Sequence, residues 1–139
     1  MRVDARRGAK QTGVGHAVGD NKAFRVNLPH RQSFSPDAAY YTGPRSGMKF
    51  YPVPPVFAAE VRSESERGPK AERAIADKRA DYFAGGTRVV WDVDLNSDEV
   101  VRKYTAADPA NPTVFRRGEI ADAEPAVPGW RMQVDELFA

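Results

Sequence analysis

The sequence contains no cysteine and only two histidines. Without cysteine the chain can form no disulfide bond, thiolate metal site or cysteine nucleophile. With only His16 and His30 available, a zinc site built from several histidines or a serine–histidine relay has little material. The remaining candidates for chemistry are the charged side chains Asp, Glu, Lys and Arg, which make up 29% of the residues.

A long apolar run and a large net charge are also missing. No segment approaches the roughly 18 consecutive apolar residues of a membrane span, and the charged start lacks the apolar core of a secretory signal. The 21 basic and 19 acidic residues give a net charge of +2, which attracts nucleic acid only weakly over distance. We therefore expect a soluble, cytoplasmic protein in which any anion binding is local.

The length of 139 residues and the hydrophobic content of 41% fit one domain with a modest core. Residues 1–22 are rich in Gly, Arg and Lys and show neither helical nor strand periodicity. We expect them to form an irregular or mobile N-terminal segment, and residues 23–139 to form the folded domain.

Apolar periodicity divides the folded domain into strands and one main helix. The pattern predicts a helix over 70–84, a short closing helix over 134–138, and strands over 24–28, 38–42, 56–61, 87–93, 99–104 and 113–116. The order strand, helix, strand across 56–93 indicates a right-handed crossover. We therefore expect an α/β (α+β) fold with a central mixed sheet flanked by a helix.

Lys78 is unusual because the helical period places it on an apolar stripe. At about 100° per residue, Ala74, Ile75, Lys78 and Tyr82 fall on one arc. An ammonium group held against a core is unfavourable unless it snorkels to solvent, meets a carboxylate or loses its proton. For a lysine taken alone, snorkelling or an ion pair is the ordinary explanation, and the pattern leaves all three open.

Two carboxylates supply a candidate metal site. Asp37 precedes the predicted strand at 38–42, and Glu60 lies near the end of the predicted strand at 56–61. If these strands are neighbours, Asp37 can lie across from Glu60, and the two carboxylates can share a hard cation such as Mg²⁺ or Mn²⁺. The backbone carbonyl of Val61 is a predicted third ligand, and water completes the shell.

Phosphodiester hydrolysis needs a nucleophile made from water and neutralisation of the charge that grows on the phosphate. Lys78 would orient or deprotonate the attacking water, a role suited by partial burial and a lowered pKa. Arg62 projects to the same strand face as Glu60 and would contact the phosphate as a fixed cation. The pattern therefore predicts Asp37, Glu60 and Lys78 as catalytic residues.

Four segments, in this order, resemble the Uma-type restriction endonucleases, a bacterial family within the PD-(D/E)XK nuclease superfamily: SFSPDAAYY, VFAAEVRSES, DKRADYFAGGTRVVWDVD and VPGWRMQVDELF. The resemblance implies a restriction-endonuclease-like core, Pro36-Asp37 as the PD motif, and Glu60 as the second metal-binding acid. It also implies that Lys78 is a catalytic lysine that has migrated to the helix from the position held here by Arg62. A homodimer is expected, because symmetric cutting of duplex DNA needs two active sites.

The N-terminus departs from the family pattern. Relatives carry an N-terminal helical region with a further acidic residue, and residues 1–22 contain no counterpart. The leading hypothesis is a Mg-dependent DNA endonuclease. The alternative is a catalytically inactive module of the same fold that binds nucleic acid or a protein partner.

Other acidic and aromatic residues have simpler interpretations. Asp92 and Asp94 alternate with apolar residues, so we expect them to face solvent rather than to support the site. Trp91 and Trp130 are expected to pack in the core or at an interface rather than to stack on nucleic-acid bases. A third hypothesis is an interaction domain in which both tryptophans and Phe138 form a surface for a partner chain.

Overall fold

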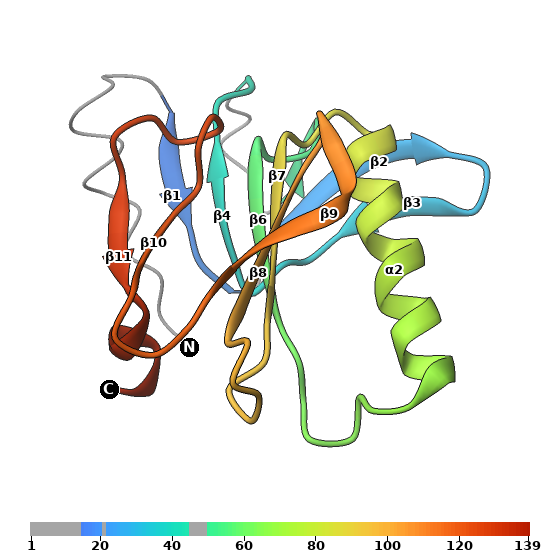
Figure 1. The fold of residues 1–139 in the computed structure, drawn as a ribbon. Helices are drawn as coiled ribbons and strands as arrows, with labels where there is room; N and C mark the ends of the chain where they lie inside the picture. Colours follow the sequence, from blue (N-terminus) through green and yellow to red (C-terminus); the bar gives the residue numbers. More distant parts are fainter. Residues whose placement is uncertain (1–14, 21, 45–49) are drawn as a thin grey trace.

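The fold is built on a mixed sheet, seen in a computed structural model that describes residues 15–20, 22–44 and 50–139. The sheet contains six strands: β1 (His16–Val18), β4 (Ala38–Tyr41), β6 (Phe57–Val61), β7 (Val89–Val93), β8 (Val101–Thr105) and β9 (Asp108–Phe115). They follow the spatial order β1–β4–β6–β7–β8–β9 (Figure 1). Within this sheet β6 and β7 are parallel and joined through helix α2 (Pro69–Ala84), while the other neighbours are antiparallel. The predicted α+β class is confirmed.

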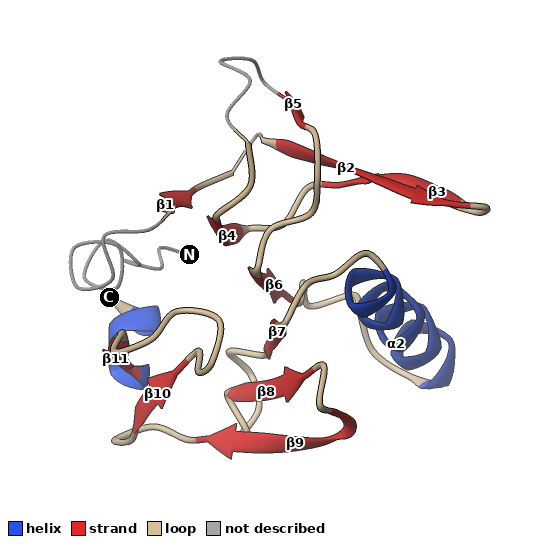
Figure 2. Ribbon diagram, turned by 90° about the horizontal axis from the view of Figure 1, so that it is seen from above, coloured by secondary structure: helices blue, strands red, loops and turns tan. Residues whose placement is uncertain are grey.

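Two smaller sheets accompany the central one. The first contains β2 (Ala23–Leu28), β3 (Arg31–Phe34) and β5 (Phe50–Tyr51), and the second pairs β10 (Ile120–Asp122) with β11 (Arg131–Gln133). The 3-10 helix η1 (Val134–Phe138) follows β11. Seen from above in Figure 2, the β2–β3 hairpin and α2 lie apart from β10 and β11, with the central strands between them. No helix in the described ranges is long and apolar enough to cross a bilayer.

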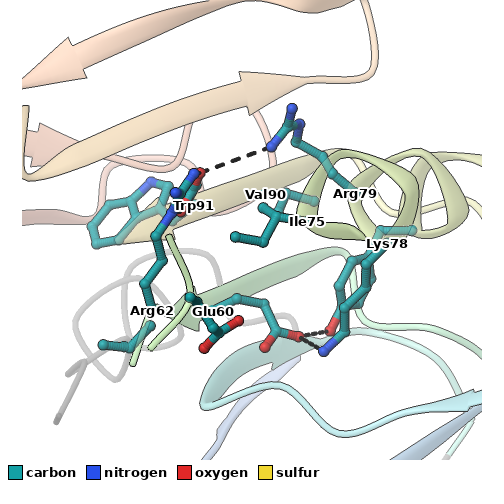
Figure 3. Close-up of a pocket in the computed structure, with 11 residues that line it drawn as sticks. Glu60, Arg62, Ile75, Lys78, Arg79, Val90 and Trp91 are labelled. Carbon is teal, nitrogen blue, oxygen red and sulfur yellow. Dashed lines mark hydrogen bonds and ion pairs between the residues drawn. The ribbon is translucent and has the colours of Figure 1, made fainter. Parts of the chain in front are cut away.

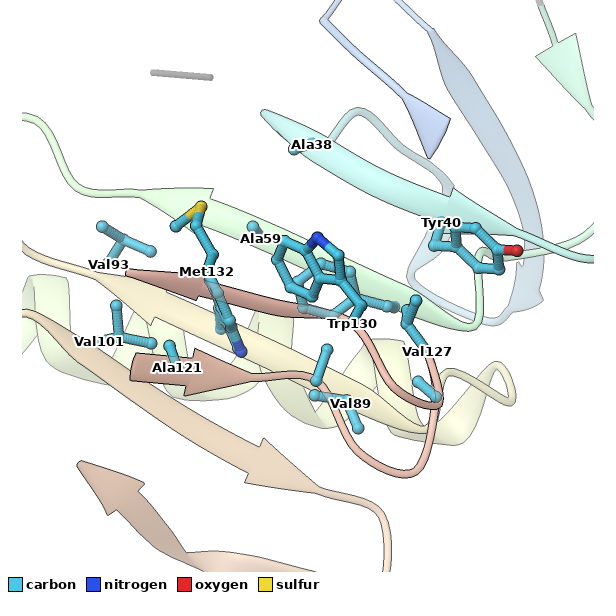
Figure 4. Packing of buried hydrophobic residues seen from close by; sticks show 14 of the residues in the cluster. Ala38, Tyr40, Ala59, Val89, Val93, Val101, Ala121, Val127, Trp130 and Met132 are labelled. Carbon is cyan, nitrogen blue, oxygen red and sulfur yellow. The ribbon is translucent and has the colours of Figure 1, made fainter. Parts of the chain in front are cut away.

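The larger core lies between the central sheet and the C-terminal segment (Figure 4). Trp91 of β7 and Trp130 contact each other with ring centroids 5.3 Å apart, and Phe57 of β6 packs against both. All three rings are fully buried. Of the two predicted alternatives, core and interface, the tryptophans therefore take the core, and the hypothesis that they form a surface for a partner is wrong.

The opposite face of the sheet packs against α2. Ala58 of β6 and Val90 of β7 belong to the cluster that also contains Tyr82 of the helix. Side chains alternate along a strand, so Glu60 and Asp92, two residues further on, project to the same face. They are direct partners in the parallel pairing of β6 and β7. The helix-covered face therefore receives two carboxylates from adjacent strands.

Five of the predicted strands and the main helix agree with the structure to within two residues at either end. The strand predicted at 113–116 is longer than expected, because β9 begins at Asp108 and runs through Pro109 and Pro112. Its place at the edge of the sheet explains this, since an edge strand need not donate its outer N–H groups. The closing helix at 134–138 is confirmed as η1.

The expectation of irregular structure over residues 1–22 is wrong at His16–Val18, where β1 pairs antiparallel with β4. Residues 1–14 and 21 of that segment lie outside the described residues, and the boundary between residues 22 and 23 stays a prediction. The sequence pattern also missed β3, β5, β10 and β11. These strands have two to four residues, too few to show a period.

A buried carboxylate on α2 anchors the β2–β3 hairpin. Asp81 is 7% exposed, accepts a hydrogen bond from Nε of Arg31 at 2.7 Å, and pairs with Nε2 of His30 at 2.7 Å. Burial opposes ionisation, but the hydrogen bonds from Arg31 and then His30 outweigh it and lower the pKa of Asp81 below its ordinary value. The hairpin turn is thus fixed to the helix that carries Lys78.

We predict that Trp130→Ala removes about 3–5 kcal/mol from the free energy of unfolding, because it leaves a cavity beside Trp91 and Phe57. Urea unfolding followed by circular dichroism measures the change. Ile120→Ala is the control, since Ile120 is 54% exposed and its truncation should have little effect. Equal losses for the two variants would contradict the burial of Trp130 in an aromatic core with Trp91 and Phe57.

We also predict a pH dependence of stability that comes from Asp81. Because its pKa is lowered in the folded state, its contribution is complete above the unfolded pKa of about 3.9 and is lost as the pH falls through the lower folded value. Urea unfolding at a series of pH values should therefore show a smaller acid-induced loss of stability in Asp81→Asn than in wild type. Asp98→Asn, which changes an exposed acid, should follow the wild-type curve.

Candidate active site

Lys78 and Tyr82 of α2 meet Glu60 of β6 at a single carboxylate oxygen. Nζ of Lys78 lies 2.9 Å from Oε2 of Glu60 (Figure 3), and the phenol of Tyr82 donates to the same oxygen at 2.6 Å. The two helix residues are four positions apart, so the helical period turns both toward β6. No side chain or backbone group of the described residues donates to Oε1. Glu60 therefore has one oxygen fixed and one free.

Asp37 lies immediately before β4 and beside Glu60. The pairing of Ala38 with Ala59 puts the next position, Asp37, opposite Glu60. Oδ2 of Asp37 accepts the backbone N–H of Val61 at 2.7 Å, and the Asp37 N–H donates to the carbonyl of Ala59 at 3.0 Å. Oδ1 receives no hydrogen bond from the described part of the chain. The strand pairing on which the placement of Asp37 depended is confirmed.

A cavity of about 80 Å³ opens between α2 and the ends of β6 and β7. Glu60 and Lys78 line it together with Ile75 and Tyr82, while Asp37 approaches Glu60 from the β4 side. The side chain of Lys78 is 34% exposed. Of the three explanations for a lysine on an apolar stripe, the structure therefore shows the ion pair.

Arg62 is bound by carboxylates on both sides of its guanidinium group. Its Nε and Nη2 donate to Asp92 at 2.9 and 2.7 Å, and Nη1 and Nη2 donate to Glu72 in the first turn of α2. The bonds to Asp92, then those to Glu72, raise the pKa of Arg62 above its usual range. These interactions use most of the five donors of a guanidinium group, so a phosphate must displace a carboxylate to reach Arg62.

Asp92 and Asp94 are buried, so the expectation that they face solvent is wrong. Asp92 is 4% exposed and pairs with Arg62, and Asp94 is 7% exposed and accepts a hydrogen bond from Arg67 at 2.6 Å. Strand alternation gives the same pattern whether the polar face meets water or a covering helix. Here α2 and the segment that leads into it supply the arginines that compensate both charges.

Tyr82 is the residue at this site that the sequence pattern did not single out. It is fully buried, and burial followed by the neighbouring charge of Glu60 raises the pKa of its phenol well above the ordinary value. The phenol therefore acts as a hydrogen-bond donor. The available signal was its spacing of four residues from Lys78, which lets two helix residues reach one partner.

The oxygen atoms near Glu60 can be compared with the ligands that a divalent cation requires. Within residues 15–20, 22–44 and 50–139, no group of three or more His, Asp and Glu side chains could hold a metal ion. Asp37 and Glu60 each offer one free oxygen, and the backbone N–H of Val61, the residue after Glu60, binds the other oxygen of Asp37. Mg²⁺ commonly binds through one or two carboxylates and keeps several waters for the substrate to replace. The residues therefore fit an open magnesium site rather than a closed cage.

The structure is thus an α+β protein that brings two acids of neighbouring strands and a lysine of the crossover helix to one place. The chain belongs to the Uma2 family, whose model, described as "Putative restriction endonuclease", matches residues 7–135. It is similar to a crystal structure described as "a putative nuclease belonging to DUF820" from Anabaena variabilis ATCC 29413. That match has a TM-score of 0.72 at 15% identity and covers 96% of this chain and 73% of the other. At this identity it shows the fold alone. No curated protein matches the chain.

We predict that Asp92→Ala lowers the free energy of unfolding by about 3 kcal/mol, because it leaves a buried guanidinium group without its main partner. Asp135→Ala is the control, because the ion pair of Asp135 with Arg117 is exposed on both sides and its loss should leave the unfolding midpoint unchanged. Chemical denaturation of both variants measures the difference. An unchanged midpoint for Asp92→Ala would contradict the assigned burial of the Arg62–Asp92 pair.

Proposed function

We propose that this protein is a divalent-metal-dependent DNA endonuclease that hydrolyses phosphodiester bonds. The main support is the convergence of Asp37, Glu60 and Lys78, which come from three separate segments of the chain. Each carboxylate has one oxygen held by the protein and one free. Membership of the Uma2 family supports the same class of reaction.

Asp37 and Glu60 are the proposed protein ligands of Mg²⁺ or Mn²⁺, through Oδ1 and Oε1, with the backbone carbonyl of Val61 as a third ligand. When bound, the ion supplies Lewis acidity for water and phosphate. The contribution of the chain is to fix the ligands in advance. The N–H of Val61 holds Asp37, and the helix holds Glu60.

Lys78 is the proposed residue for orienting or deprotonating the attacking water. Its Nζ lies next to Glu60, and the side chain is open enough to solvent for the amine to turn toward a substrate. A lysine can release a proton, whereas an arginine stays protonated. Arg62 is therefore kept as a phosphate contact only, which it can make once Glu72, the more exposed of its two partners, moves away.

The size of the cavity supports a polymeric substrate. Sites for small molecules usually enclose about 300–1,000 Å³, and the cavity beside Glu60 has about 80 Å³. It can admit a phosphate group and water but not a whole nucleotide. We therefore propose that DNA lies across the surface and presents one phosphodiester to the acids.

Two further expectations stay predictions. Cutting both strands of a duplex calls for a homodimer, and the protein is expected in the cytoplasm.

A second candidate is an inactive module of the same fold that binds nucleic acid or a protein partner. Two observations favour it. Within the described residues no group of three or more acids or histidines could hold a metal ion, and the guanidinium group of Arg62 is already bound by Glu72 and Asp92. The two candidates differ in metal affinity. Calorimetric titration with Mn²⁺ in the presence of DNA should release or absorb heat for the nuclease and show no binding for the inactive module.

We predict that the wild-type protein nicks supercoiled plasmid DNA only when Mg²⁺ or Mn²⁺ is present. Asp37→Asn should abolish nicking, and Lys78→Ala should slow it by about 100-fold or more, the usual contribution of a positioned general base. Lys70→Ala is the matched control, because Lys70 is an exposed lysine on the same helix. Nicking that survives both Asp37→Asn and Lys78→Ala would remove these residues from the mechanism.

A further inference from the structure

Tyr82 contacts a proposed metal ligand, although the mechanism above assigns it no chemical step. We propose that Tyr82 is a positioning residue that holds Glu60 ready for the metal ion, and that the β2–β3 hairpin keeps Tyr82 in place. This inference rests on the proposed function, because it concerns the same metal site.

A glutamate needs such support because the terminal torsion of its side chain is soft. Without a partner, Glu60 could exchange its two oxygens or turn away from Asp37. In the structure Oε2 accepts a hydrogen bond from the Tyr82 phenol at 2.6 Å and lies 2.9 Å from Nζ of Lys78 in an ion pair, while Oε1 stays open. The same arrangement holds Asp37, where a backbone N–H fixes one oxygen.

The two partners of Glu60, the hydrogen-bonding Tyr82 and the ion-paired Lys78, differ in their freedom to move. Lys78 has a long flexible side chain that is 34% exposed, and its proposed role requires it to leave Glu60 for water. Tyr82 is fully buried and has only two side-chain torsions. The phenol can therefore keep Glu60 in position at the moment when the ammonium group turns to the substrate.

The β2–β3 hairpin restrains Tyr82 from its other side. The ring of Phe34 in β3 stacks on the ring of Tyr82, with centroids 3.9 Å apart and an angle of 14° between the planes. Asp81, the preceding residue of α2, is bound to the hairpin through His30 in the turn and Arg31 in β3. Three residues after Phe34 the chain reaches Asp37. The hairpin thus helps to position both Tyr82, which binds Glu60, and Asp37, which follows β3 in the chain.

The test is calorimetric titration of the metal-free protein with Mn²⁺, without DNA, for wild type, Tyr82→Phe and Tyr104→Phe. Tyr82→Phe keeps the ring and its stacking and removes only the hydroxyl group. It should weaken Mn²⁺ binding by about 10-fold or more, as expected for the loss of a group that orients a metal ligand. Tyr104 is 9% exposed and packs under Arg79, so Tyr104→Phe should bind Mn²⁺ as wild type does.

Phe34→Leu provides a second arm, because it keeps the hydroxyl group and loosens the ring. It should weaken Mn²⁺ binding by a smaller factor than Tyr82→Phe. Wild-type affinity in this variant would overturn the part assigned to the hairpin. Thermal unfolding without metal shows whether each variant is folded.

The outcomes separate this inference from the proposed function. If wild type binds Mn²⁺ and Tyr82→Phe binds it equally well, Tyr82 is not a positioning residue, although the metal site remains. If Tyr82→Phe and Tyr104→Phe lose affinity to the same extent, the effect is general packing and the inference is again overturned. If wild type binds no Mn²⁺ in this titration, the proposed metal site fails and the inference fails with it.

Discussion

The structure depends on how charge is accommodated between α2 and the ends of β6 and β7. Glu60 and Asp92 are direct partners on adjacent parallel strands and project beneath the same helix. Two carboxylates cannot remain there without cations and donors, because burial of an unpaired charge is strongly unfavourable. The helix and the segment before it provide them, through Lys78 for Glu60 and Arg62 for Asp92. The apolar packing of α2 and its charge pairing therefore determine the same position for the helix.

Asp92 and Glu60 differ in how many of their carboxylate oxygens are bound by other side chains, and this number decides whether an oxygen remains for a ligand. Asp92 binds Arg62 through both oxygens and is 4% exposed, so it has little left to offer a ligand. Glu60 has one occupied oxygen and one free, and Asp37 beside it has the same arrangement. Arg62 is thus held in a buried ion pair with Asp92, while Lys78 is paired with the partly exposed Glu60, where we propose that the chemistry takes place.

Much of this arrangement could be predicted from the sequence. Strand β6 and helix α2 have clear patterns of apolar residues, which predict both elements and the crossover that they form. Lys78 could be selected because it is a charged residue on the apolar stripe of the helix. Other features could not be predicted because the pattern carries no information about them. Asp92 alternates as a solvent-facing residue does, and only the position of the helix shows that it is buried. Tyr82 counts as apolar in a periodicity plot, although its hydroxyl group is what contacts Glu60. Strand β1 has three residues, and β9 passes through two prolines that only an edge strand tolerates.

The central claim is that the free oxygens of Asp37 and Glu60 bind one divalent ion. Anomalous diffraction from crystals soaked in Mn²⁺ tests it most directly, because manganese is located without reference to activity. We predict one strong peak about 2.1 Å from Oδ1 of Asp37 and from Oε1 of Glu60, with Oε2 still bound to the Tyr82 phenol. A crystal without a peak between these oxygens, or with manganese bound only at acids elsewhere on the surface, would contradict it.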